Sequence, residues 1–338
     1  MARSELTIDL GALRKNTRRL LDVLDGAELW AVVKANGYGH GAADCAVAAL
    51  EAGATALCVA TVGEALALRG PLPDARVLVL GPTAAGEVAA ARAARLELTV
   101  SGGEIPDGVA VHVKLDTGMG RWGVSELSAP SRSVVGVMTH LATADSDLEF
   151  ARTQIRRFTE ATEPLAGLTR HVANSAAALR LPESRFDAAR CGIALYGLSP
   201  FGTDAADDGL APVLRWTSEI ALCRLLRAGE STGYGRRFVA ERDTWLAIVP
   251  VGYADGFRRE LTGTEVIVAG ERRRVVGTVS MDAFAVELDH ELPLGTPVTI
   301  VGEGVTLEEH ARIAGTITYE LASRLASSPE RATRTLVS

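Results

Sequence analysis

The sequence is poor in cysteine, and its cysteines are not spaced as metal ligands usually are. It contains 338 residues but only four cysteines, and no two of them form a Cys-x-x-Cys pair. Closely spaced cysteines mark structural zinc sites, and dense cysteines mark disulfide-stabilised secreted domains. We therefore expect no metal site, and we interpret the cysteines as small buried apolar residues in a reducing compartment: Cys45, Cys58, Cys191 and Cys223.

The sequence also lacks a long uncharged apolar stretch and an excess of positive charge. Its apolar runs are far shorter than the roughly 18 residues that a membrane-spanning helix requires. The formal net charge is −7, so a surface for nucleic acid or anionic lipid is not expected. The first residues lack the apolar core of a secretory signal. These absences predict a cytoplasmic protein that binds neither membranes nor nucleic acid.

The first part of the chain alternates short apolar runs with longer alanine-rich segments. At about 150 residues per domain the length predicts two domains, and the alternation predicts that residues 1–205 form an α/β domain, a (β/α)8 TIM barrel. Leucines at helical spacing from Asp9 predict a helix before the first strand, and this helix can pack with the second domain. The predicted barrel strands are Leu29–Val33, Ala56–Ala60, Arg76–Leu80, Glu97–Val100, Val109–Leu115, Val134–His140, Arg170–Ala173 and Phe186–Ala189.

A stretch rich in glycine and aspartate, Tyr196–Asp208, follows the barrel region, and we place the domain boundary at residues 205/206. Residues 206–338 contain β-branched runs broken by glycine and proline, which predict a mostly β domain with antiparallel strands. Two helices are expected in it, one after the capping box that begins at Thr306 and one near Tyr319–Ala326. The predicted strands are Trp216–Leu226, Thr244–Val251, Thr264–Ala269, Arg274–Val279, Ala283–Leu288 and Pro297–Val301.

Lys34 follows the apolar run Leu29–Val33 and precedes the glycine-rich stretch Ala35–Gly41. Burial of an ammonium group lowers its pKa below the ordinary value of about 10.4. An amine with a lowered pKa is what an enzyme needs to form a Schiff base with an aldehyde cofactor. The alternative is a lysine whose stem is buried while its charged head reaches the solvent. The segment alone leaves both interpretations open.

Other predicted barrel strands also end in polar residues, where barrel enzymes place their chemistry. The stretch Lys114–Arg121 brings two cations and a carboxylate around two glycines. It is either a salt-bridged turn or a loop in which Arg121 binds a carboxylate or a cofactor oxygen. His140 and His171 lie at the ends of two further strands, where each is either a structural histidine or part of a site.

The stretch Arg190–Gly197 lies at the last predicted barrel strand. In barrels of this class the late loops often hold a phosphate with backbone N–H groups. Gly192 and Ile193 can offer such groups, and Ser175 and Tyr38 can add hydroxyls. A pyridoxal phosphate-dependent enzyme requires both a phosphate anchor and an amine at the end of a strand.

Taken in order along the chain, these stretches resemble those of the alanine racemase family. The resemblance covers nearly the whole chain, since it continues in Gly233–Phe238, Gly252–Phe257 and Ser280–Asp282. It implies an enzyme that interconverts L-alanine and D-alanine with pyridoxal 5'-phosphate, on a barrel followed by a β-domain. It also implies a head-to-tail homodimer, in which the β-domain of each subunit completes the active site of the other.

The resemblance assigns roles to residues at matching positions. Lys34 resembles the lysine that binds the cofactor and acts as the base on the D face, and Tyr234 resembles the opposing base, contributed by the other subunit. A tyrosine with its ordinary pKa near 10 is a poor base, so the family's chain from Tyr234 through His140 to Arg190 is expected to assist it, with His171 near the arginine. Arg190 resembles the partner of the pyridine nitrogen of the cofactor. It keeps this nitrogen largely unprotonated, which limits side reactions such as transamination.

Further roles follow from the same resemblance. Lys114 matches a lysine that is carbamylated in many members and then pairs with the neighbouring arginine, here Arg121. Arg121 and the backbone N–H of Met281 resemble the groups that receive the substrate carboxylate, and Tyr253 resembles a residue of the passage that admits substrate. Leu336 stands where members of the family have a tyrosine near the end of the chain. This departure predicts more room beside the substrate methyl group.

Alternatives to an alanine racemase remain open at this point. The extra room favours a racemase of serine or of a broader set of small amino acids. A non-catalytic pyridoxal phosphate binding protein is a second alternative, but a carrier has no use for Tyr234 as a second base. A decarboxylase of related architecture is a third, although the motifs of the second domain are not typical of one. Use of the product in cell-wall synthesis is an inference from the family alone.

Overall fold

The computed structural model describes residues 3–127, 131–326 and 328–338, and the chain divides into two compact units. Gly11–Ala211 form the first unit, and Met1–Leu10 together with Pro212–Ser338 form the second. No helix within the described ranges is long and apolar enough to cross a lipid bilayer.

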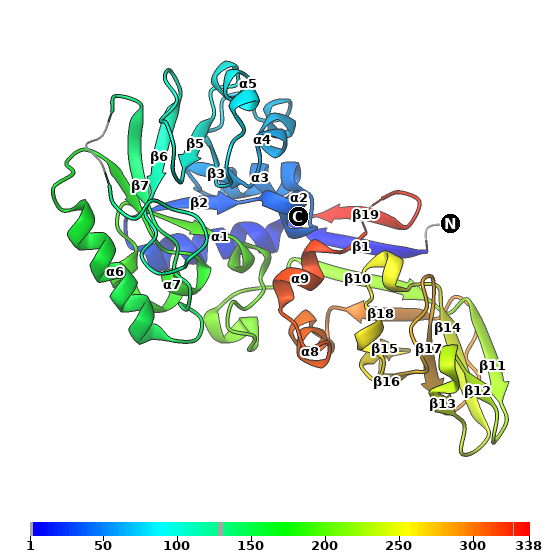
Figure 1. Ribbon diagram of the computed structural model, residues 1–338. Coiled ribbons are helices and arrows are strands. Elements are labelled where there is room, and N and C mark those ends of the chain that lie inside the picture. The colour runs from blue at the N-terminus through cyan, green and yellow to red at the C-terminus, as the bar shows by residue number, and fades with distance from the viewer. Residues whose placement is uncertain (1–2, 128–130, 327) are drawn as a thin grey trace. The chain divides into compact units, whose positions relative to one another are not determined.

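The first unit is built on a closed barrel of eight parallel strands, which runs from blue to green in Figure 1. Consecutive strands are neighbours, and the last strand closes the barrel by pairing with the first. The expected (β/α)8 barrel is therefore confirmed, and its apolar runs are the strands that helices cover. The strands are β2 (Glu28–Val32), β3 (Ala56–Val59), β4 (Val77–Val79), β5 (Glu97–Val100), β6 (Ala110–Lys114), β7 (Val134–Met138), β8 (Thr169–His171) and β9 (Ala188–Cys191).

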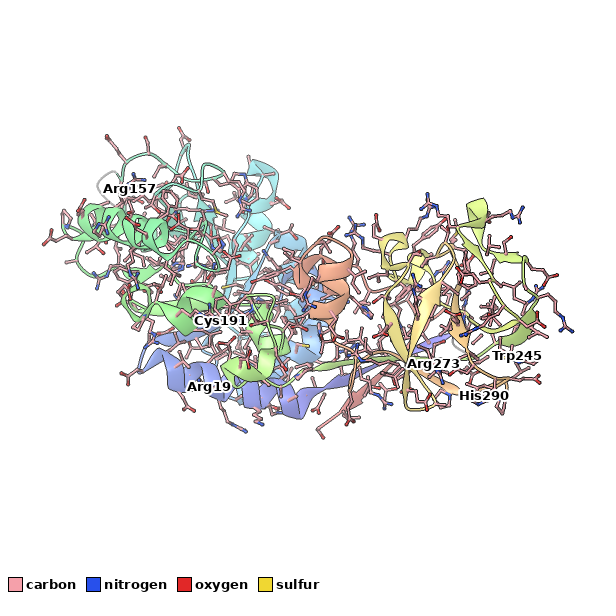
Figure 2. All side chains as sticks on the ribbon, turned by 90° about the horizontal axis from the view of Figure 1, so that it is seen from below. Arg19, Arg157, Cys191, Trp245, Arg273 and His290 are labelled. Atoms are coloured by element: carbon pink, nitrogen blue, oxygen red, sulfur yellow. The ribbon has the colours of Figure 1, made fainter. Side chains whose placement is uncertain are left out.

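Helices lie on the outside of this barrel (Figure 1). Exposed Arg19 and Arg157 project from α1 and α6, whereas Cys191 lies buried within the unit (Figure 2). This distribution is the ordinary one for amphipathic helices that cover a sheet. The helices are α1 (Leu10–Leu24), α2 (Lys34–Tyr38), α3 (Ala42–Glu51), α4 (Val62–Arg69), α5 (Val88–Ala93), α6 (Leu148–Thr162) and α7 (Ser175–Arg180), with short 3-10 turns at Ala85–Glu87, Pro182–Ser184, Ile193–Tyr196 and Ala205–Asp208.

The second unit is built on a nine-stranded sheet in the order β11-β14-β17-β16-β15-β18-β10-β1-β19. All its neighbouring strands are antiparallel except β1 and β19, which are parallel. The expected mostly β domain is therefore confirmed. Its elements are β1 (Ser4–Asp9), β10 (Leu214–Glu219), β11 (Leu222–Leu226), β14 (Thr244–Val249), β15 (Glu265–Val268), β16 (Glu271–Val276), β17 (Phe284–Leu288), β18 (Pro297–Val301), β19 (Ala332–Val337), a separate pair β12 (Ser231–Thr232) and β13 (Phe238–Val239), the helices α8 (Leu307–Ile313) and α9 (Thr318–Ser323), and 3-10 turns at Tyr234–Arg236, Tyr253–Asp255 and Arg259–Leu261.

The structure differs from the sequence-based expectation in three places. Strand β1 pairs with β10 and β19, so residues 4–9 belong to the sheet of the second unit, and the helix that follows them, α1, lies almost wholly in the first. The boundary between the units falls at Ala211/Pro212 rather than at 205/206. The single strand expected at Trp216–Leu226 is two strands, because β10 pairs with β18 while β11 pairs with β14 elsewhere in the sheet.

Candidate active site

Lys34 lies just beyond the carboxyl end of β2, at the start of a turn with an uncommon backbone conformation. Ala35, Asn36 and Gly37 have φ angles of 51°, 52° and 62°, in the left-handed region that residues other than glycine rarely adopt. Side-chain oxygens hold this turn. Glu64 accepts a hydrogen bond from the Ala35 N–H at 2.7 Å, and Asn36 Oδ1 accepts one from the first N–H of α3 at 3.1 Å. The surrounding groups therefore fix a conformation that the local sequence does not favour.

The Lys34 amine has a perturbed acidity. Burial lowers the pKa of this amine from its ordinary value, the positive charge of Arg121 lowers it further, and the Glu64 carboxylate raises it. Arg190 contributes a smaller lowering. A lowered pKa enlarges the neutral fraction, which is the nucleophilic form. The geometry thus favours a reactive amine over a lysine that merely reaches the solvent.

Arg190 is the centre of a buried polar network. It lies on β9, next to β2 in the barrel, and is 4% exposed. Its guanidinium donates to His171 Nδ1 at 2.8 Å and to the Thr139 carbonyl oxygen at 2.8 Å, and lies 3.3 Å from His140 Nδ1. Burial lowers the pKa of Arg190 to about 10, and burial with the Arg190 charge holds the pKa of both histidines well below the usual value. The structure therefore joins a charged arginine to two neutral histidines.

A second cluster lies where β8 and β9 lead into their loops. Ser175 Oγ accepts hydrogen bonds from the N–H groups of Gly192 at 3.0 Å and Ala194 at 3.4 Å. Ile193 begins the short 3-10 turn between them. A Cβ atom on Gly192 would lie 2.3 Å from the Tyr38 hydroxyl, so glycine is needed there. The structure thus brings together the four residues expected at a phosphate.

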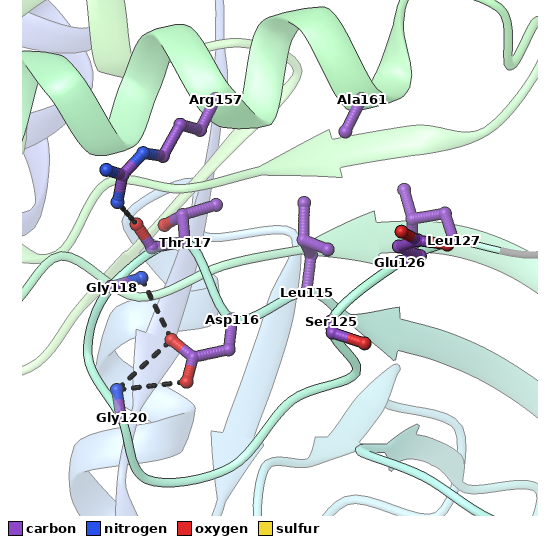
Figure 3. Close-up of a pocket in the computed structure, with 10 residues that line it drawn as sticks. All are labelled: Leu115, Asp116, Thr117, Gly118, Gly120, Ser125, Glu126, Leu127, Arg157 and Ala161. Atoms are coloured by element: carbon purple, nitrogen blue, oxygen red, sulfur yellow. Dashed lines mark hydrogen bonds between the residues drawn. The ribbon is translucent and has the colours of Figure 1, made fainter.

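Lys114 ends β6, and Arg121 lies in the loop that follows. Burial, and then the charge of Arg121, lower the pKa of Lys114 to about 8. Both cations lie over Trp122, with Lys114 Nζ at 5.6 Å and the Arg121 guanidinium carbon at 5.0 Å from the ring centroid. The Asp116 carboxylate stabilises the loop, because it accepts hydrogen bonds from the three consecutive N–H groups of residues 118–120. Figure 3 shows the hydrogen bonds that Gly118 and Gly120 donate.

The same loop borders a pocket of about 690 Å³, shown in Figure 3. The pocket lies between the loop and α6, whose Arg157 donates a hydrogen bond to the Thr117 carbonyl oxygen at 2.9 Å. Its lining contains Asp116 and Gly118 but neither Lys34 nor Arg190. This pocket is therefore separate from the cluster around Lys34 and Arg190 at the end of the barrel.

The second unit holds the other three expected site residues. Tyr234 is 73% exposed, and its carbonyl oxygen accepts a hydrogen bond from Thr278 Oγ1 at 2.8 Å. The Tyr253 N–H donates to the Ser280 carbonyl oxygen at 3.1 Å, and the next N–H donates to that of Met281 at the same distance. Tyr253 and Met281 are therefore on two joined loops. Both are about half exposed, and exposed aromatic and apolar side chains of this kind suit contact with another molecule.

Several residues that support the site were not expected from the sequence. Asp282, next to Met281, accepts hydrogen bonds from Arg3 at 3.2 Å and from Arg331 at 3.1 Å, and these partners lie at opposite ends of the chain. The role of Glu64 had one visible signal, the capping box with Thr61. Leu336, the position of the expected departure from the family, lies on β19 opposite Ile8 and is 41% exposed.

Two family descriptions together cover most of the chain. "Alanine racemase, N-terminal domain" matches residues 8–200, and "Alanine racemase, C-terminal domain" matches residues 213–333. The boundary between the units at Ala211/Pro212 falls in the short gap between the two matches.

Individual proteins are similar over the same extent. "Alanine racemase 1" of Bacillus subtilis is 40% identical, over 96% of this chain and 91% of that protein. The structure of alanine racemase from Streptomyces coelicolor is 37% identical with a TM-score of 0.90, and covers 99% of this chain and 98% of its own. The biosynthetic alanine racemase of Pseudomonas aeruginosa is 34% identical with a TM-score of 0.91, and the match covers 100% of both chains.

Proposed function

Since this chain belongs to the alanine racemase family, we propose that it interconverts L-alanine and D-alanine. The reaction removes the Cα proton on one face of the substrate and returns a proton on the other. The observation that carries the proposal is an amine of lowered pKa, Lys34, at the carboxyl end of a barrel strand next to the one that bears Arg190. A cytoplasmic location and a supply of D-alanine for cell-wall synthesis belong to the same proposal.

The residues of the barrel fit pyridoxal 5'-phosphate. The fit is visible at Gly192, because only glycine lets the Tyr38 hydroxyl lie this close to the backbone N–H groups expected at the phosphate. When bound, this cofactor supplies an electrophilic carbon for the amino group and a ring that accepts negative charge from Cα. The residues that would hold it are Lys34 at the aldehyde, Arg190 at the ring nitrogen, His140 beside that arginine, and Ser175, Gly192, Ile193 and Tyr38 at the phosphate.

Two bases on opposite faces carry the proton. Lys34 Nζ takes or returns the Cα proton on the D face, because its lowered pKa makes the neutral amine accessible. Tyr234 of the partner subunit does the same on the L face through its phenolic oxygen. The large exposure of Tyr234 on its own unit supports this arrangement, which requires a homodimer.

Arg190 and His140 support these proton transfers. Arg190 stays charged at neutral pH, since its pKa is about 10, and a charged guanidinium has no lone pair with which to accept a proton. With the cofactor bound, it would therefore donate a hydrogen bond to the ring nitrogen and keep that nitrogen unprotonated, which would limit transamination. His140 accepts from Arg190 at Nδ1, so its Nε2–H is free to stabilise the phenolate of the partner's Tyr234.

The substrate carboxylate is received by Arg121 and by the backbone N–H of Met281, and Tyr253 lines the passage that leads to them. Lys114 joins this group as a carbamate, formed when its neutral amine takes up carbon dioxide and releases a proton. The product is an anion that pairs with Arg121 and replaces the repulsion between two neighbouring cations.

The proposal is tested by incubating the purified protein with L-alanine in heavy water. We expect D-alanine with deuterium at Cα. Cofactor absorbance near 420 nm without either product would instead indicate a carrier. A parallel incubation with L-serine tests the substrate, and conversion of serine as fast as alanine would refute the assignment to alanine.

Complementation tests the contribution of the partner. Lys34→Ala and Tyr234→Phe are each expected to lose racemisation. When the two proteins are dissociated, mixed and reassociated, half of the dimers are hybrids with one intact site, so about a quarter of the wild-type activity returns. If both bases came from one subunit, no activity would return.

A further inference from the structure

The polar network around Arg190 continues through the interior of the barrel to its opposite end. His171 Nε2 lies 2.8 Å from His112 Nδ1, and His112 Nε2 lies 2.8 Å from a carboxylate oxygen of Glu97. Both histidines are fully buried. Glu97 is the first residue of β5, and its other oxygen accepts a hydrogen bond from Arg76 Nε at 2.7 Å. This chain of hydrogen bonds therefore ends at the amino ends of the barrel strands, at the opposite end of the barrel from Lys34.

The two ends of this chain fix the direction of every hydrogen bond in it. A guanidinium can only donate, so Arg190 makes Nδ1 of His171 an acceptor. A neutral His171 then carries its proton on Nε2 and donates to Nδ1 of His112. His112 in turn carries its proton on Nε2 and donates to Glu97, which accepts as a carboxylate. Burial lowers the pKa of both histidines, which agrees with neutral rings.

The side chains and backbone around this hydrogen-bond chain pack closely against its two histidine rings. A Cβ atom on Gly136 would lie 2.3 Å from His112 Nδ1, so β7 has a glycine where it passes this ring. Trp30 packs against both histidines, with ring centroids 5.6 Å from His112 and 4.5 Å from His171. The rings are therefore held in place from two sides.

Among residues 3–127, 131–326 and 328–338 no carboxylate lies within salt-bridge distance of Arg190. The series of hydrogen bonds through His171 and His112 instead connects Arg190 to the carboxylate of Glu97. We propose that Glu97 and His112 are positioning residues for the racemase site. They keep His171 in the one tautomer that accepts from Arg190, and so hold the guanidinium of Arg190 where it would meet the ring nitrogen of the bound cofactor. The inference rests on the proposed function for this last step only. The alternative is that the chain serves the stability of the barrel alone.

The tautomers are measured directly by nitrogen NMR of protein labelled with nitrogen-15 in its histidines. The sequence has only six histidines, so the spectrum is sparse. We expect a proton on Nε2 and none on Nδ1 for both His112 and His171. A proton on Nδ1 of either ring would overturn the proposal. This measurement needs neither a variant nor turnover, so its result does not depend on activity. If the wild-type protein failed to racemise alanine, the proposed function would be refuted, but the tautomers of His112 and His171 would still test the positioning role.

The second measurement compares two glutamates at the same end of the barrel. Glu97→Gln removes the charge and leaves one amide N–H facing a donor, either His112 or Arg76. Glu28→Gln is the matched control, since Glu28 is also the first residue of its strand and pairs with Arg76 at 3.6 Å, but accepts from Trp30 Nε1 rather than from a histidine.

In Glu97→Gln we expect kcat to fall about tenfold with an unchanged KM, since a hydrogen bond to a charged group is weakened. We also expect a larger share of turnovers in which the amino group stays on the cofactor and alanine leaves as pyruvate. Glu28→Gln should change neither quantity, although both variants lower Tm. Equal effects in the two variants, or an unchanged pyruvate share in Glu97→Gln, would overturn the proposal and leave the chain a role in stability alone.

Discussion

Carbamylation of Lys114 provides the sharpest quantitative test of the site's electrostatics. Only a neutral amine reacts with carbon dioxide. With a pKa of about 8, about a quarter of the Lys114 amines are neutral at pH 7.5, against about one in a thousand for a fully solvated lysine with pKa near 10.4. Burial beside Arg121 therefore raises the reactive fraction about two hundredfold. The carbamate then gains an ion pair with Arg121, which draws the equilibrium further toward the modified form.

The assay is carbon-13 NMR of the holoprotein in carbon-13 bicarbonate. We expect one carbamate signal that disappears in Lys114→Met and weakens as the pH is lowered, because protons compete with carbon dioxide for the amine nitrogen. The chain has only three lysines, and the exposed Lys15 on α1 is an internal control that should give no signal. A signal that survives in Lys114→Met, or the lack of any signal in the wild type, would refute the reasoning.

Three further predictions follow from close contacts in the barrel. Gly192→Ala places a methyl group against the Tyr38 hydroxyl; overpacking of about 1–3 kcal/mol should lower Tm by about 2–12 °C and weaken cofactor binding, measured by equilibrium dialysis. Gly86→Ala is its control, because a Cβ atom there meets nothing within 4 Å. Equal cofactor affinity in the two variants would contradict a phosphate site at Gly192. Glu64→Leu removes the acceptor of three backbone N–H groups, those of Ala35, Ala60 and Thr61, so calorimetry should show a loss of about 0.5–1.5 kcal/mol for each. Stopped-flow absorbance should show a slower attachment of cofactor, and Glu64→Gln should be milder in both measurements. Asp116→Asn loosens the loop that carries Arg121, the arginine proposed to bind the substrate, so steady-state kinetics should show KM for alanine raised about tenfold with kcat little changed. A loss in kcat alone would contradict this role.

The barrel could be predicted from the sequence because most of its strands are short apolar runs, with β8 (Thr169–His171) the clear exception. Such runs are local signals, and the polar residues that follow them mark the ends of the strands. Strand β1 was missed because its partners are not local. Ser4–Asp9 pairs with β10 and with β19, which lie about two hundred and more than three hundred residues further along the chain. Separation along the sequence also explains why the contacts of Asp282 were not expected, since Arg3 lies 279 residues and Arg331 49 residues away from it.

The candidate site could be predicted as a set of residues but not as a geometry. Lys34 stood out because a cation follows an apolar run, yet nothing in Ala35 or Asn36 signals a left-handed turn. His112 did not stand out, because it lies within the apolar run of β6 and its partner Glu97 belongs to another strand. The resemblance to the family supplied Tyr234, for which the sequence offers no local signal.

The parallel pairing of β1 with β19 has a consequence for biogenesis. A nascent chain must hold residues 4–9 without their final neighbours until residues 332–337 have left the ribosome, by which time the whole barrel has been synthesised. We therefore expect co-translational folding to proceed from the barrel to the sheet, with closure of the edge as the last event. A circular permutant that links the end of β19 to the start of β1, through a linker long enough to connect two parallel strands, would place these neighbours close together in the sequence and let them pair before translation ends.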